Sequence, residues 1–109
     1  MWVIKNRITN EYDHKGMYGK RNTIARAAWG TLGQAKCHVC MNMADNWYLE
    51  ADFINISEDG TGLTLHVIDY IKDYLRAKIA KCPQFTKQEA DHLAFIEKYE
   101  RESKQENQE

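Results

Sequence analysis

The sequence predicts a small α+β domain, in which a short antiparallel sheet of three to four strands packs against an N-terminal helix and two C-terminal helices. Three observations predict this class. Runs of large and branched residues are typical of strands, apolar residues elsewhere recur at helical spacing, and Gly, Asn and Asp residues separate these segments. The 109 residues suffice for one modest core. We therefore expect a single domain over residues 1–101 and a polar, frayed tail over residues 102–109.

The first elements are a strand and a loose hairpin. The stretch WVIKNR near the N-terminus is rich in large and branched residues, which predicts a strand. The polar run that follows contains the turn residues Gly16 and Gly19. Tyr12 and Tyr18 in the same run suggest a returning strand that is broken by a loop.

A helix is predicted over residues 23–36. Asn22 or Thr23 can cap its N-terminus by accepting a backbone N–H. Apolar residues then recur at helical spacing, at Ile24, Ala28, Leu32 and Ala35. Gly30 and Gly33 would each cost about 1 kcal/mol relative to Ala inside this helix, unless another backbone packs closely against them. The alternative is a helix that ends early, near Gly33.

A strand is predicted over residues 47–56 by alternation of apolar and polar residues. One set of alternate residues is wholly apolar and would form the buried face: Trp47, Leu49, Ala51 and Phe53. The other set would face solvent: Tyr48, Glu50 and Asp52. The alternation breaks at residues 54–56, where either a bulge shifts the register or both faces are covered.

The last part of the chain predicts one strand and two helices. The turn SEDGTG leads to a strand expected over residues 62–66, because Leu63, Leu65 and Val67 alternate. An apolar stripe then predicts a helix over residues 67–81, formed by Ile68, Ile71, Leu75 and Ile79. Pro83 ends this helix. The capping box TKQE, Thr86 to Glu89, begins a last helix over residues 87–101.

Composition indicates where the protein works. The sequence shows no basic leader followed by a long apolar stretch, and no window approaches the ~18 apolar residues of a spanning helix. Three cysteines are an odd number and too few for a small secreted scaffold. We therefore expect a cytoplasmic protein with free thiols and no membrane association.

The cysteines Cys37 and Cys40 form a C-x-x-C pair, which is half of a typical zinc site. The second half would have to come from isolated residues such as Cys82 and His66. A redox pair would need the motif at a helix N-terminus, whereas here a predicted helix runs into Cys37. We therefore expect small structural residues and no cofactor, with a zinc site of Cys37, Cys40, Cys82 and His66 as the alternative.

Charge is divided unevenly along the chain. No acidic residue occurs between Asp13 and Asp45, a window that holds five basic residues. Residues 51–109 contain eight basic and twelve acidic residues, a balance of −4. This division can steer an anionic partner toward the N-terminal half, unless the two faces are merely solvated. The basic window and its neighbouring aromatic residue supply the first candidate contact surface: Lys15, Lys20, Arg21, Arg26 and Trp29.

A second candidate contact surface combines aromatic and acidic side chains. It lies on the stretch NWYLEAD and consists of Trp47, Tyr48, Glu50 and Asp52. Such a surface would fit a basic groove on a partner, including a groove that normally holds nucleic acid. The alternative is an ordinary half-buried strand whose outer face is solvated.

The sequence gives no support for catalysis. A nucleophile elbow, an H-E-x-x-H motif and a Ser–His–Asp spacing are all missing from it. Asp69 and Asp73 lie one helical turn apart, but on the polar face of an amphipathic helix, where solvated carboxylates are usual. The four histidines are scattered. We therefore expect a protein that is not an enzyme.

The layout of residues 1–56 resembles that of small phage-encoded accessory proteins. WVIKNRITNEYDHKG followed by KRNTIARAAWGTL is similar to their short strand, polar turn and helix with small residues, and NWYLEADFINI is similar to the strand that follows. The resemblance implies that the protein binds and blocks a host or defence macromolecule, as anti-CRISPR inhibitors do. It carries over no functional residue, because it matches no defined motif.

These observations predict a non-catalytic binding protein that works by surface complementarity in the host cytoplasm. The favoured partner is a host or defence protein. A nucleic acid bound by the basic segment 15–36 is one alternative, and a small zinc-stabilised module is another. A short sheet also leaves an open edge, which a second copy could pair with to form a homodimer.

Overall fold

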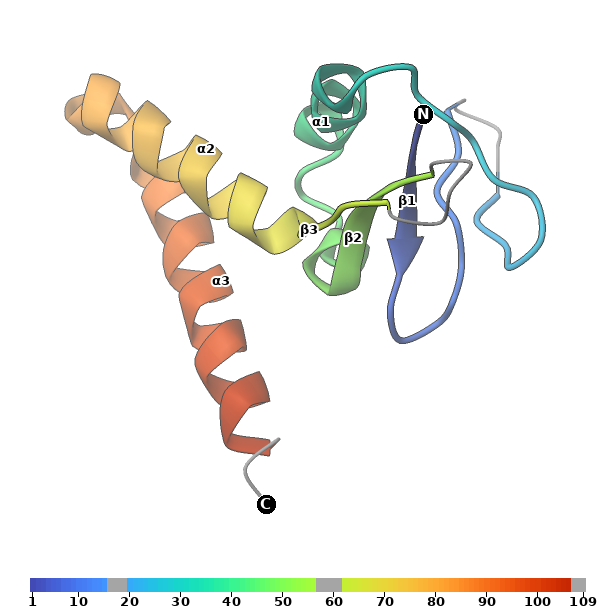
Figure 1. Cartoon of the computed structure of the whole chain (residues 1–109). Helices are drawn as coiled ribbons and strands as arrows, with labels where there is room; N and C mark the ends of the chain where they lie inside the picture. The colour runs from blue at the N-terminus through green and yellow to red at the C-terminus, as the bar shows by residue number, and fades with distance from the viewer. Residues whose placement is uncertain (16–19, 57–61, 107–109) are drawn as a thin grey trace. The chain divides into compact units, whose positions relative to one another are not determined.

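The computed structural model describes residues 1–15, 20–56 and 62–106. It has an α+β architecture, with a three-stranded antiparallel sheet, one helix between strands and two C-terminal helices (Figure 1). The predicted fold class is thereby confirmed. The chain groups into two compact units, Met1–Asp69 and Tyr70–Glu109, and each is described here by itself.

The sheet of the first unit has the strand order β1-β2-β3. β1 (Trp2–Asn6) pairs with β2 (Ala51–Asn55), and β2 pairs with β3 (Thr64–His66). The register between β1 and β2 is continuous from Trp2 opposite Asn55 to Asn6 opposite Ala51. Residues 54–56 are half-buried. The broken alternation there therefore reflects partial cover of both faces, and β2 contains no bulge.

The outer edge of β1 is covered by irregular chain instead of a full strand. Trp2 and Trp29 exchange backbone hydrogen bonds of 2.7 and 2.8 Å, and the Asp13 N–H donates to the Ile4 carbonyl at 2.9 Å. The predicted returning strand is reduced to bridges of Tyr12 with Lys5 and Asn22. The other tyrosine of that prediction, at position 18, lies outside the described residues.

The predicted helix over residues 23–36 is wrong in position, because α1 spans Leu32–Met41. Thr31 and Gln34 form a capping box: Thr31 Oγ1 accepts the Gln34 N–H at 3.2 Å, and Gln34 Oε1 accepts the Thr31 N–H at 3.3 Å. Asn22 accepts from two backbone N–H groups but closes only a local turn. Ile24, expected in the core, is 90% exposed.

The predicted strand over residues 47–56 begins later than expected. Residues Asn46–Glu50 form the 3₁₀ helix η1, which starts where Asp45 Oδ1 accepts the Trp47 N–H at 3.0 Å. The turn points Tyr48 into the core, where it is 1% exposed, instead of toward solvent. Trp47 is half-buried. Capping by Asp45 therefore favours a 3₁₀ turn at residues where the alternating pattern predicts a strand.

The core of the first unit joins β1, β2, α1 and η1. Its most deeply buried apolar side chains are Val3, Ile4, Ala35, Val39, Leu49, Ala51, Phe53 and Val67, together with the ring of Tyr48. Each large side chain among them contributes about 1.5–3 kcal/mol by leaving water. This core holds α1 and η1 beside the segment that contains Asp13.

The C-terminal elements agree closely with expectation. β3 leads directly into α2 (Val67–Lys81), as predicted, and its stripe residues Ile71 and Leu75 are buried. Pro83 begins the 3₁₀ turn η2 (Pro83–Phe85), and α3 follows over Lys87–Glu106. Ile96 on α3 is buried. The backbone of α3 continues five residues beyond the predicted end, into the expected tail.

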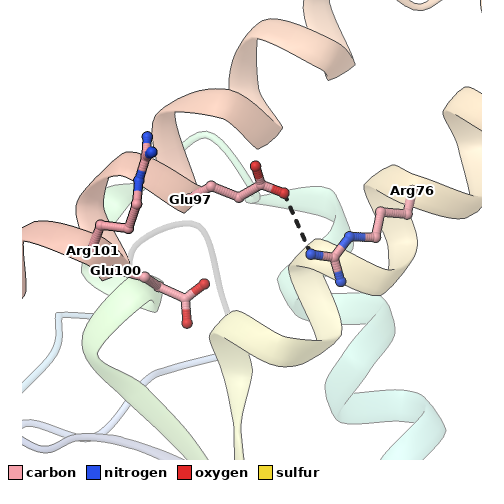
Figure 2. A pocket seen from close by; sticks show the side chains of 4 residues that line it. All are labelled: Arg76, Glu97, Glu100 and Arg101. Carbon is pink, nitrogen blue, oxygen red and sulfur yellow. Dashed lines mark hydrogen bonds and ion pairs between the residues drawn. The ribbon is translucent and has the colours of Figure 1, made fainter. Parts of the chain in front are cut away.

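Cross-helix ion pairs show that α2 and α3 run antiparallel in the second unit. Lys72 pairs with Glu100 at 2.7 Å, and Lys78 pairs with Glu89 at 3.3 Å. Between them, Arg76 reaches Glu97 at 3.4 Å across a shallow hollow of about 320 Å³ (Figure 2). Residues later in α2 pair with residues earlier in α3, so the two helices form an antiparallel hairpin.

Candidate functional site

The first unit contains a polar pocket of about 460 Å³ between the segment after β1, the end of α1 and the start of η1. This volume falls in the range of small-molecule sites and of hollows that receive a partner's side chain. The described residues that line it are Asp13, His14, Lys15, Arg21, His38, Met41, Asn42, Asp45 and Tyr48.

Asp13 is the centre of the pocket and is 2% exposed. Its carboxylate accepts a hydrogen bond from the Tyr48 hydroxyl at 2.6 Å and one from Arg21 Nε at 3.1 Å. His38 Nε2 lies 3.2 Å from the same group, and the His14 backbone N–H donates at 3.0 Å. A buried carboxylate is tolerated only with such partners. The local chain, α1 and η1 each supply one or more of them.

Arg21 joins the buried carboxylate to the surface. Its Nη1 donates to Asp45 Oδ2 at 2.8 Å, and its guanidinium lies 4.0 Å from the centre of the Trp47 ring. Burial lowers the pKa of Arg21. Hydrogen bonds with Asp45 and Tyr48 and the charge of Asp13 together raise this pKa by more than burial lowers it, so the net pKa is above its ordinary value. Arg21 is therefore a fixed cation in the wall of the pocket.

The same contacts change two further pKa values. Burial raises the pKa of Asp45, but the Trp47 N–H and Arg21 lower it more, so the net pKa lies below its ordinary value. Burial, and then the hydrogen bond to Asp13, raise the pKa of Tyr48 above its ordinary value. The Tyr48 hydroxyl thus keeps its proton and stays a donor, while Asp45 stays an acceptor.

The opposite wall is aromatic and basic. The rings of Trp29 and His38 have centroids 5.1 Å apart, and the Lys15 ammonium lies 5.6 Å from the centre of the Trp29 ring. His14 Nδ1 is buried and has no hydrogen-bond partner among the residues that the structure describes. A buried ring nitrogen of this kind usually bonds to a water molecule or a bound group. The wall can therefore receive a polar group from outside.

The structure brings together five of the nine predicted contact residues. Lys15, Arg21 and Tyr48 line the pocket, and Trp29 and Trp47 pack against its cations. Trp29 is 6% exposed, so it and Tyr48 support the pocket from inside. Their predicted role as direct contact residues stays a prediction, and both side chains are buried in this structure.

The other four predicted contact residues lie outside the pocket lining. Lys20 and Arg26 are exposed on the irregular segment before α1. Glu50 is half-buried at the end of η1. Asp52 is 6% exposed and accepts from Arg7 Nη1, and His66 Nδ1 lies 2.7 Å from the same oxygen. Asp52, which the sequence assigns to an acidic surface, therefore has a buried and paired carboxylate in the structure.

The alternative zinc site finds no support in the geometry. Cys37 and Cys40 are the sixth and ninth residues of α1, and His66 is paired with Asp52. Cys82 is exposed directly after α2. Within residues 1–15, 20–56 and 62–106, no group of three His, Cys, Asp or Glu side chains could hold a metal ion. Both thiols of α1 also lie far from its N-terminus, where a helix dipole would activate them.

Sequence reasoning missed six of the lining residues: Asp13, His14, His38, Met41, Asn42 and Asp45. One signal was present. Asp13 and Asp45 are the two carboxylates that border the acid-free window, and Arg21 within that window pairs with both. A stretch of basic residues that is bordered by two acidic residues can indicate an internal ion-pair network as well as a basic binding surface.

Comparisons with known protein families, with curated proteins and with solved structures find no match for this chain. Among the helices of the described residues, none combines the length and the apolar character that a membrane span requires.

Proposed function

We propose that this protein is a non-catalytic binding protein of the phage accessory or inhibitory kind, which blocks a host or defence macromolecule in the host cytoplasm. The observation that carries the proposal is the closed network around Asp13. Tyr48, Arg21 and His38 all contact its carboxylate within 3.2 Å. A carboxylate occupied in this way fixes the shape of a surface and is not free to act as a base.

The lining of the pocket supports binding over chemistry. Of the lining side chains that the structure describes, none is a Ser, Thr or Cys that could attack a substrate. The Arg21–Trp47 stack holds a planar cation and an aromatic ring at the surface with little freedom left to lose. Pre-ordered Arg and Trp side chains are the commonest anchors of protein–protein interfaces.

The contact surface that we propose consists of the pocket rim and the exposed cations beside it: Lys15, Lys20, Arg21, Arg26 and Trp47. Lys15, Lys20 and Arg26 are exposed, and Arg21 and Trp47 are half-buried. No acidic residue occurs in the sequence between Asp13 and Asp45. The surface therefore fits an acidic patch of a protein partner.

The test is capture of partners from host lysate by the tagged full chain, with two matched double variants. Lys20→Glu/Arg26→Glu reverses two exposed charges of the proposed surface, and Lys98→Glu/Arg101→Glu reverses two exposed charges on α3. Arg21 is left intact because its loss would remove a partner of the buried Asp13 carboxylate and destabilise the fold. We expect the first variant to lose the partner and the second to keep it. Equal recovery by both variants, with both folded, would contradict the proposed surface.

A nucleic acid is the second candidate partner. The specific observation is that Lys15, Lys20 and Arg26 are all exposed within the acid-free window. Phosphate binding releases counterions, so affinity would fall steeply with salt. Titration of labelled DNA and RNA at two salt concentrations separates the candidates: a steep salt dependence supports nucleic acid, and absence of binding at low salt eliminates it.

A further inference from the structure

The connection between α2 and α3 carries a second concentration of positive charge. Residues 74–88 contain four basic residues and no acidic one. Two of the four are neutralised across the hairpin, because Arg76 pairs with Glu97 and Lys78 pairs with Glu89. Lys81 and Lys87 are exposed and form no ion pair with any residue that the structure describes. The end of the hairpin therefore has two available cations.

The same end of the hairpin has an apolar hollow of about 480 Å³. Tyr74 and Ala77 of α2 form one side, and Cys82 and Phe85 of the connection form another. Lys78 and Lys81 also line it, and the aliphatic stem of a lysine can cover apolar surface. Phe85 is 83% exposed, more than any other aromatic side chain among the residues that the structure describes. A large exposed aromatic ring beside an apolar hollow is typical of an interaction site.

The exposure of Phe85 is built into the turn. Pro83 ends α2 and starts η2, and the Phe85 N–H donates to the Cys82 carbonyl at 3.2 Å. The buried hydroxyl of Thr86 donates to the same carbonyl at 3.0 Å. The ring therefore projects from a hydrogen-bonded turn and not from a frayed end. Ordering it in a complex would cost little conformational entropy.

We propose that this hairpin end, formed by Tyr74, Ala77, Lys81, Phe85 and Lys87, is a docking surface for an acidic protein segment with a large apolar side chain. The apolar side chain would fill the hollow beside Phe85, and carboxylates would pair with Lys81 and Lys87. Charge complementarity selects an acidic segment over a basic one. A concave apolar hollow with two available cations suits a side chain better than a phosphate backbone, which needs many cations.

This surface lies wholly within the second unit, so the inference does not rest on the function proposed for the first unit. The capture experiment above changes Lys20 and Arg26, and the experiment below changes other residues. Failure of one proposal therefore leaves the other testable.

The test is an NMR titration of the isotope-labelled full chain with two short synthetic peptides. The peptides share the same Leu and Trp residues, and one carries Glu where the other carries Lys. We expect the acidic peptide to shift the resonances of Ala77, Lys81, Phe85 and Thr86, and the basic peptide to leave them unchanged. Phe85→Ser and Lys81→Glu/Lys87→Glu should each weaken acidic-peptide binding by about tenfold or more.

The matched control is Lys98→Glu/Arg101→Glu, which reverses two exposed cations elsewhere on α3 and should retain binding. Phe85 is 83% exposed, so its replacement should disturb the fold little, and circular dichroism checks that each variant is folded. The proposal is overturned if the acidic peptide shifts no hairpin resonance, or if the basic peptide binds equally. It is also overturned if only a DNA duplex or phosphatidylglycerol vesicles bind through Lys81 and Lys87.

Discussion

The Nε atom of Arg21 lies 3.1 Å from Oδ1 of Asp13, a carboxylate that is almost fully removed from solvent. This contact connects a surface cation to the interior of the first unit. It also changes the meaning of the basic window. Arg21 stabilises the fold, while Lys20 and Arg26 on either side of it are exposed. Stability and recognition can therefore be separated by mutation.

Arg21→Met should destabilise the protein. It removes one partner of a buried carboxylate, a change that typically costs about 3–5 kcal/mol, and the low end applies because Tyr48 and His38 remain. Urea unfolding followed by circular dichroism measures the free energy of unfolding. Lys20→Met is the matched control and should change it by less than about 0.5 kcal/mol. Equal effects would show that the Arg21–Asp13 pair contributes nothing.

Tyr48→Phe should destabilise the protein by about 1.5–3 kcal/mol, because it removes a hydrogen bond to a charged acceptor and leaves the ring in place. A double-mutant cycle with Asp13→Asn isolates the contact between the two residues. The cycle should give a clear coupling energy. Additive effects of the two substitutions would mean that the 2.6 Å hydrogen bond has no energetic role.

Stability should decrease at acid pH in a way that depends on Asp45. The pKa of Asp45 is lower in the folded protein than its ordinary value, so the folded state favours the ionised form. Its contribution is complete above the ordinary Asp pKa of about 3.9 and is lost as pH falls through the lowered value. Asp45→Asn should flatten this part of the stability profile measured between pH 5 and 2. An unchanged profile would refute the assignment.

The start of α1 can be tested with two threonines. Thr31→Ala removes the N-cap and should cost about 1 kcal/mol of unfolding free energy. Thr23→Ala changes an exposed residue outside any helix and should have almost no effect. Thermal or urea unfolding compares the two variants. A larger loss for Thr23→Ala would restore a helix that begins near residue 23.

Metal content tests the zinc alternative. Purified protein should contain well below one zinc ion per chain by elemental analysis, and its melting temperature should not change after chelation, because a structural zinc site would contribute folding free energy. Cys37→Ser/Cys40→Ser should melt close to the wild type, as the first thiol is exposed and the second half-buried. Stoichiometric zinc that is lost together with the fold would contradict this.

The parts of the fold that could be predicted from the sequence are those specified by local patterns. β1 follows from a compact apolar run and ends one residue before the end of the predicted stretch, and α2 follows from a stripe ended by Pro83, with its bounds confirmed. The helix expected over residues 23–36 fails because Trp29 pairs with Trp2, a contact between distant residues that keeps the chain extended until Thr31. Helical spacing alone cannot reveal that competition.

In the pocket, too, the sequence predicts what local patterns specify and not what contacts between distant residues decide. Lys15 and Arg21 were identified from the basic window, and both line it. The paired role of Arg21 could not be predicted, because Asp13 and Asp45 are 8 and 24 residues away from it and meet it only in the folded chain. The alternating pattern predicts that Tyr48 faces solvent, whereas the 3₁₀ turn of η1 directs its hydroxyl toward Asp13.

We propose that this protein works by the shape and charge of an exterior surface on its first unit. The most direct measurement is the calorimetric affinity of the captured partner for the wild type, for Lys20→Glu/Arg26→Glu and for Lys98→Glu/Arg101→Glu. We expect binding to weaken by about tenfold or more for the first variant and to stay unchanged for the second. Equal affinity for all three folded proteins, or turnover of the partner in place of stable binding, would contradict it.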